Sequence, residues 1–278
     1  MNKILFPTDF SKTADNAFLY ALTLAEKMDA SLTLLHVYEL PELGRSLKTT
    51  TKEVYEMMEM EALEDFKKSV KKLRGLAEEK GLNHISFSHQ MEEGETVSVV
   101  AHIAKQLEVD LIVMGTKGAT GLQEIFLGSV ATGVIDESEK PVLTIPDKAS
   151  YKDTIDKVAY LSNYKDEEAA AFREGFAFAG LFNAQVLCVH YDGEQQVENK
   201  HRDEWRAKIT DETKNIDFNV ITGPSFEEAL VKFNKDAQID ILAVQPRKKN
   251  VFARLFSTSV SKTIAHHLNI PLLTLPKK

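Results

Sequence analysis

The sequence contains an internal repeat, and no other feature constrains the fold as strongly. Residues 3–11 match residues 157–165 at a shift of 154 positions, and residues 110–114 match residues 240–244 at a shift of 130 positions. These two shifts also align His36 with His190, Ser129 with Ser259, Pro141 with Pro271 and Pro146 with Pro276. A repeat of this length predicts two copies of one structural unit, which we assign to residues 1–148 and 153–278.

The copies differ in length at one place. The first carries a segment from about Thr50 to Lys80 where the second keeps only a short polar stretch. The apolar residues of that segment recur at helical spacing, and they are Val54, Met57, Met58, Leu63, Phe66, Val70, Leu73 and Ala77. We expect a long helix that packs on the rest of the unit. Together with Met60, its methionines are typical of an adaptable contact surface, but packing on a sheet accounts for Met57 and Met58, which we expect in the core.

Strands and helices alternate within each copy. The expected strands of the first copy are residues 3–6, 31–37, 84–89, 111–114 and 142–145. The expected helices, besides the long one, are residues 11–28, 97–106 and 129–137. This order, without short hairpin turns, is typical of an α/β fold: two tandem open parallel-sheet units, each with helices on both faces.

Composition excludes several classes of protein. The formal net charge of −8 argues against a protein that coats nucleic acid or an anionic membrane. No run of about 18 apolar residues could span a bilayer. The single cysteine, Cys188, cannot form an intramolecular disulfide. We therefore expect a cytoplasmic protein without nucleic-acid or membrane partners.

A glycine-rich segment follows the apolar strand of residues 111–114. It comprises Gly115, Gly118 and, after nine further residues, Gly128 and Ser129. Glycines at the carboxyl end of a parallel strand let backbone N–H groups approach phosphate oxygens, and a helix that begins there favours an anion. The segment lacks the Gly-Lys-Ser/Thr of a Walker A loop and is not a G-x-G-x-x-G pattern. The alternative is that these glycines only mark the turn between strand and helix.

This glycine pattern, with Pro7-Thr8-Asp9 closing the first strand, resembles the nucleotide-binding motif of the universal stress protein family. The resemblance implies a Rossmann-like fold of the adenine nucleotide alpha hydrolase type. It also implies that ATP, or ADP or AMP, binds with Mg2+ or Mn2+ bridging its phosphates. The implied contact residues are Pro7, Thr8, Asp9, Val37, Met114, Gly115, Gly118, Gly128, Ser129 and Val130. For Asp9 the alternative role is to cap the following helix.

The resemblance extends to assembly. It implies that the final strands of the two copies, residues 142–145 and 272–275, pair antiparallel, so that the chain forms an intramolecular pseudo-dimer. A homodimer of two such chains is a further expected partner state.

The second copy lacks most of the motif. Gln245, Lys248, Thr258 and Asn163 replace Gly115, Gly118, Gly128 and Asp9, and Tyr191 replaces Val37. We expect no nucleotide in this half. The motif offers neither a catalytic base nor metal-ligand spacing, so the interpretation is a stress-response sensor or regulator without catalytic residues. The alternatives are a nucleotide-free interaction module and a slow ATPase.

Overall fold

The computed structural model describes residues 2–39, 51–116, 127–149, 151–192, 199–209, 216–246 and 269–276. The described strands are β1 (Asn2–Pro7), β2 (Ala30–Tyr38), β3 (Phe87–Glu93), β4 (Leu111–Gly115), β5 (Val142–Ile145), β6 (Lys157–Leu161), β7 (Gln185–Tyr191), β8 (Ile216–Ile221), β9 (Ile241–Val244) and β10 (Leu272–Thr274). The described helices are α1 (Lys12–Met28), α2 (Thr51–Glu79), α3 (Thr96–Gln106), α4 (Ser129–Glu137), η1 (Asp166–Glu168, a 3-10 helix), α5 (Ala169–Gly180), α6 (Asn199–Ile209) and α7 (Phe226–Ala237).

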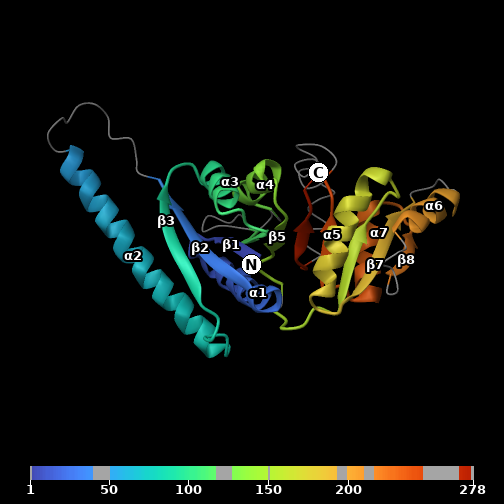
Figure 1. The fold of residues 1–278 in the computed structure, drawn as a ribbon, viewed down its shortest axis with the longest axis horizontal. Helices are drawn as coiled ribbons and strands as arrows, with labels where there is room; N and C mark the ends of the chain where they lie inside the picture. Colours follow the sequence, from blue (N-terminus) through green and yellow to red (C-terminus); the bar gives the residue numbers. More distant parts are fainter. Residues whose placement is uncertain are drawn as a thin grey trace.

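These strands form one sheet in the order β3-β2-β1-β4-β5-β10-β9-β6-β7-β8 (Figure 1). From the centre outward, the first half has the order β5-β4-β1-β2-β3 and the second half has the equivalent order β10-β9-β6-β7-β8. Neighbouring strands are parallel except at the centre, where β5 and β10 pair antiparallel with Leu143 opposite Leu273. The antiparallel pairing that the family resemblance implies is therefore confirmed.

Helices cover both faces of the sheet, as predicted. Side chains of α1, α2, α5 and α6 pack into one buried apolar cluster. Side chains of α3, α4 and α7 pack into a second cluster on the opposite face. The strands supply both clusters alternately: Ile4 and Phe6 of β1 belong to the first, and Leu5 to the second. Burial on both faces explains why inner strands such as β4 and β9 are continuously apolar. No helix in the described part of the chain is both long and apolar enough to cross a bilayer.

Residues aligned by the two sequence shifts make the same contacts. The backbone N–H of Lys3 donates to Asp110 Oδ2 at 2.9 Å, and that of Lys157 donates to Asp240 Oδ2 at 3.0 Å. The two lysine ammonium groups also correspond, because each donates to a carbonyl at the end of the helix that leads into the fourth strand of its half, α3 or α7, at 2.8 and 2.7 Å. Repeated sequence thus gives repeated packing of the fourth strand of each half beside the first.

The segment between the halves is held at several points. Asn16 of α1 donates to the Ala149 carbonyl at 2.8 Å, and the hydroxyls of Thr23 and Tyr151 lie 2.7 Å apart. Lys152 forms an ion pair with the buried carboxylate of Asp240. The connection is thus tied both to α1 of the first half and to the start of β9 in the second.

Two expectations from the sequence need correction. Met57 is not in the core, because its side chain is 71% exposed, whereas α2 packs through Phe66, Val70, Leu73 and Ala77. A 29-residue helix spans roughly 43 Å and a 7-residue strand roughly 23 Å, so the first turns of α2 extend past β3, the strand beside it. The third strand was expected at residues 84–89 but is Phe87–Glu93, because its pairing places Phe87 opposite Leu32.

Candidate functional site

The predicted site lies where the carboxyl ends of β1 and β4 meet. The two strands are neighbours, with Leu5 opposite Ile112. After β1 the chain continues outward to β2 and β3, and after β4 it continues the other way to β5, so the strand order reverses between them. In open parallel sheets ligands bind in the crevice at such a reversal. Residues that directly follow β1 and β4 are therefore the candidates.

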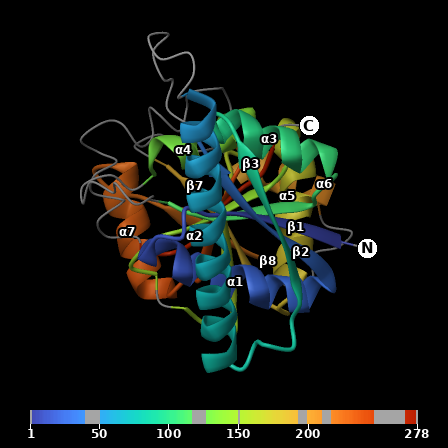
Figure 2. The same ribbon diagram turned by 90° about the vertical axis from the view of Figure 1, so that its left-hand side faces the viewer.

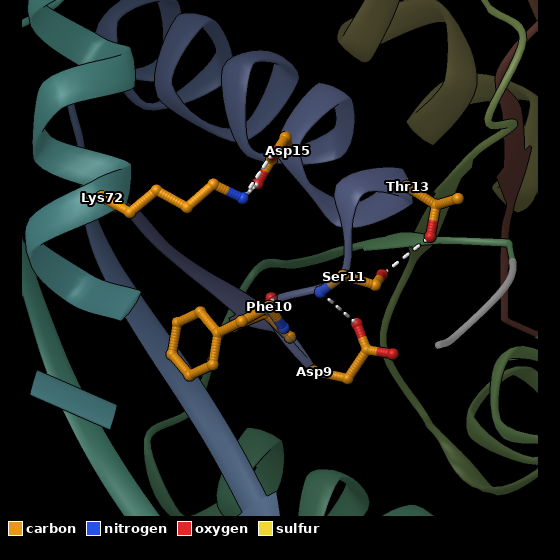
Figure 3. Close-up of polar contacts among 7 residues, drawn as sticks. Asp9, Phe10, Ser11, Thr13, Asp15 and Lys72 are labelled. Carbon is orange, nitrogen blue, oxygen red and sulfur yellow. Dashed lines mark hydrogen bonds and ion pairs between the residues drawn. The ribbon is translucent and has the colours of Figure 1, made fainter. Parts of the chain in front are cut away.

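The turn after β1 holds Asp9 at the open edge. The buried Thr8 hydroxyl accepts a hydrogen bond from the Phe10 N–H at 3.0 Å, and Asp9 Oδ1 accepts one from the Ser11 N–H at 3.0 Å (Figure 3). Phe10 has φ of 59°, in the left-handed region, which turns the chain sharply into α1. Asp9 itself is exposed. Its carboxylate thus braces the start of α1 and still lies at the edge of the crevice.

The end of β2 supports this turn from the side. His36 Nδ1 donates to the Thr8 carbonyl at 2.9 Å, and its ring lies 4.9 Å from that of Phe10. His36 thus has a structural role, because its ring holds the turn that follows β1. The next residue, Val37, is half-buried against the opposite apolar cluster, on the side of α3 and α4.

The end of β4 fixes where the glycine segment begins and ends. Met114 is buried at the end of the strand. The Thr116 N–H donates to the Ile145 carbonyl at 3.0 Å, and the Thr116 carbonyl accepts from the Gly128 N–H at 2.6 Å. The two residues that flank residues 117–126 are thus bonded to each other, and α4 begins directly beside β4. Gly118 lies outside the described residues, and its role stays a prediction.

Thr116 is a residue that the sequence reasoning missed. Its side chain is 2% exposed, and its hydroxyl has no hydrogen-bond partner among the residues that the structure describes. Buried hydroxyls are rarely left unpaired in proteins, so this one is suited to a polar group of a bound molecule. A hydroxyl residue directly after an apolar strand, inside the glycine motif, was the signal available in the sequence.

The start of α4 presents unpaired backbone amides. Gly128 is the N-cap, and Thr132 makes the first helical hydrogen bond, to the Gly128 carbonyl at 3.0 Å. The N–H groups of residues 129–131 precede it and have no acceptor within the helix. Ser129 and Val130 are exposed, so their amides are open to an anion, which the helix dipole also favours. No group of three or more His, Cys, Asp or Glu residues suited to a metal ion occurs among the described residues.

Comparison with known proteins gives the family. The model of the universal stress protein family matches residues 1–146, which end just after β5. The chain belongs to this family. Universal stress protein MJ0531 of Methanocaldococcus jannaschii is 34% identical over 144 residues, which cover 51% of this chain and 81% of that protein. Universal stress protein MJ0577 of the same organism is 30% identical over 161 residues, which cover 53% of this chain and 96% of that protein.

A solved structure extends the likeness to both halves. The crystal structure of a universal stress protein from Archaeoglobus fulgidus matches with a TM-score of 0.71 at 18% identity, and the match covers 99% of this chain and 96% of that one. At this low identity, the match shows a shared fold and nothing further. The sheet of two parallel halves is therefore an arrangement found among universal stress proteins.

The second half of this universal stress protein keeps the frame of the site. His190 Nδ1 donates to the Ser162 carbonyl at 2.8 Å, as His36 does to Thr8. Tyr164 has φ of 56° and packs on His190, as Phe10 packs on His36. At the place of Asp9 stands Asn163, and its N–H donates to the buried Glu168 carboxylate at 2.9 Å.

The contents of this second crevice differ. Tyr191, which aligns with Val37, donates its hydroxyl hydrogen to the Gly223 carbonyl at 3.1 Å and packs on Phe226 at 5.5 Å between ring centroids. Its ring thus reaches from the end of β7 toward the start of α7. Gln245, at the place of Gly115, directly follows β9. Lys248, Thr258 and Ser259 lie outside the described residues.

Proposed function

We propose that this universal stress protein binds an adenine nucleotide, ATP or else ADP or AMP, between β1 and β4 of its first half. The observation that supports the proposal is the exposed start of α4, whose first amides have no acceptor within the helix and lie next to Thr116, a buried residue whose hydroxyl has no partner among the described residues. Amides of residues 129–131 would bind the phosphates. Asp9 would accept a hydrogen bond from the ribose, and Pro7, Thr8, Val37, Met114 and Gly115 would line the nucleoside side, with Gly118 near the phosphates.

A divalent cation would be held at this site by the phosphates of the nucleotide and not by protein side chains. The described residues contain no cluster of ligands for a protein-held metal. Mg2+ commonly keeps several waters and binds mainly through nucleotide phosphates. We propose that Mg2+ enters with the nucleotide and neutralises phosphate charge, while the protein supplies backbone amides.

The proposed role is that of a sensor or regulator. Nucleotide binding to the first half alone would change the conformation or association state that a partner protein recognises. We further propose that residues 1–148 and 153–278 are two domains that form a pseudo-dimer, an arrangement supported by the β5–β10 pairing. A cytoplasmic location is part of the proposal, supported by a single, buried cysteine.

Thermal unfolding with and without Mg-ATP tests the binding. At an ATP concentration 100 times the Kd, a ligand that binds only the folded state raises the free energy of unfolding by about 2.7 kcal/mol. Gly118→Val should abolish this gain, because a side chain would occupy the phosphate position, whereas Lys248→Ala should leave it unchanged. The opposite pattern would mean that the second half binds the nucleotide.

Asp9→Ala and Asn163→Ala form a matched pair, because the two residues occupy equivalent exposed positions. Asp9→Ala should weaken ATP binding by about 10- to 100-fold, the loss of one hydrogen bond to a charged group, and Asn163→Ala should not change it. Isothermal calorimetry measures both. No binding of any purine mononucleotide by the unaltered chain would favour the interaction module, and turnover well above background would favour the ATPase.

A further inference from the structure

The outer face of α2 carries an unpaired apolar patch. Met57 is 71% exposed, Met60 66% and Leu63 40%. The helix is the outermost element at the β3 end of the molecule, and it runs lengthwise across that end (Figures 1 and 2). Its other face is buried against the sheet through Phe66, Val70, Leu73 and Ala77. Thus the patch faces solvent at an end of the molecule that no other described helix covers.

Between residues 56 and 74 the charges of α2 are divided into two blocks. Every charged residue in 56–65 is acidic, namely Glu56, Glu59, Glu61, Glu64 and Asp65. Every charged residue in 67–74 is basic, namely Lys67, Lys68, Lys71, Lys72 and Arg74. All ten are exposed. Within the chain, Lys72 forms an ion pair with Asp15 of α1 at 2.7 Å (Figure 3). Arg74 lies over the Phe87 ring.

The helix dipole does not account for this division. Its effect on charged side chains falls off within the first and last turn, whereas the two blocks occupy the middle of a 29-residue helix. Pairs within the helix do not account for it either, since alternation of sign would provide more of them, and Lys68 with Asp65 at 3.0 Å is an exposed pair of small effect. Division into one acidic and one basic block does suit a second helix that runs in the opposite direction.

We propose that the outer face of α2 binds the α2 of a second copy of this chain, with the two helices antiparallel about a twofold axis. Such an interface is self-complementary, because the acidic block of each copy then faces the basic block of the other. This contact goes beyond the proposed nucleotide binding and does not depend on it.

The helical repeat gives a register. The outward side holds Met57, Met60, Glu61, Glu64, Lys67, Lys68 and Lys71, each of which lies three or four positions from another member of the set. An axis at Glu64 brings Met57 opposite the partner's Lys71 and Met60 opposite the partner's Lys68, so that aliphatic lysine stems cover the methionines. The same axis pairs Glu61 with the partner's Lys67. Glu64 lies opposite the partner's Glu64, and Lys67 and Lys68 of both copies lie near this pair.

Cross-linking through a single introduced cysteine tests the register. At the usual separation of about 8–10 Å between packed helix axes, residues on the axis come within disulfide range. Glu64→Cys should therefore form a disulfide-linked dimer on mild oxidation of the full chain. Asp65→Cys, equally exposed and one position along, should link at least about tenfold more slowly because it points away from the partner. The native Cys188 is buried and does not interfere. Equal rates for the two variants would overturn the register.

Charge exchange tests the contact itself by sedimentation. The unaltered chain should show a monomer–dimer equilibrium that shifts to monomer in high salt. Glu61→Lys and Lys67→Glu should each weaken the dimer about tenfold or more, since two symmetric pairs become repulsive, and the double variant should restore it. Val220→Glu, at an exposed apolar position on β8, is the control and should change nothing. A chain that stays monomeric, or a dimer indifferent to the single variants, would overturn the proposal.

Discussion

Phe10 and Tyr164 are the residues that most clearly define the strand-end turns. Each adopts a positive φ, 59° and 56°, which costs a non-glycine residue on the order of 1 kcal/mol or more. Each is held by a hydroxyl acceptor two residues earlier, Thr8 or Ser162, and by packing on a histidine of the neighbouring strand. The conformation therefore depends on tertiary contacts, which explains why sequence propensity gave no indication of it.

Tyr20 gives a prediction at the same scale. Burial, with a smaller contribution from the charge of Asp240, raises the pKa of Tyr20 to about 12 from 10.0. Below pH 10 the phenol is neutral in both the folded and unfolded chains, so its burial contributes fully to the free energy of unfolding. From pH 10 to 12 the unfolded chain releases its proton first, and about 3 kcal/mol of the free energy of unfolding should be lost. Urea unfolding of Tyr20→Phe over this range should show a shallower decline than the unaltered chain, and parallel declines would contradict the assignment.

At the scale of the element, the position of α4 depends on its contact with α3. A Cβ added at Gly133 would lie 2.7 and 3.0 Å from the two methyl carbons of Val97, a stiff β-branched side chain. Gly133→Ala should therefore destabilise the chain by about 1 kcal/mol despite the helix propensity of alanine. In a Val97→Ala background the same change should instead stabilise by up to about 1 kcal/mol, since only the propensity gain remains. Chemical denaturation of the unaltered chain, the two single variants and the double variant measures this reversal of sign. The same sign in both backgrounds would mean that α3 and α4 move apart freely.

The sequence predicted most elements well and failed where a neighbour decides the outcome. Helix α4 and strand β5 have the predicted bounds, because Gly128 and Pro141 mark their starts locally. The third strand was placed too early, since its register depends on β2. Met57 was assigned to the core because helical periodicity does not show where the sheet beneath a helix ends.

The candidate site was predictable to a similar extent. The glycine pattern located the start of α4. Thr116 was missed, because only the fold shows that its hydroxyl is buried without a partner.

For the whole molecule, the β5–β10 junction makes one continuous sheet out of two repeated halves. In a chain that ends at residue 148, β5 would still pair with β4 but its other edge would have no partner, which would expose a mainly apolar edge strand. We expect residues 1–148 alone to form a dimer through β5, measured by light scattering after size-exclusion chromatography. A stable monomer of residues 1–148 would contradict the view that β10 substitutes for a second β5.

The place of Tyr191 in only one half has a consequence for how such a molecule can diversify. In an assembly of two identical polypeptides every inherited substitution is made twice, so a ring that closes one crevice closes both. In a fused chain the substitution is made once, and Val37 remains where Tyr191 stands in the other half. The residues at one crevice can thus change while those of the other half stay as they are.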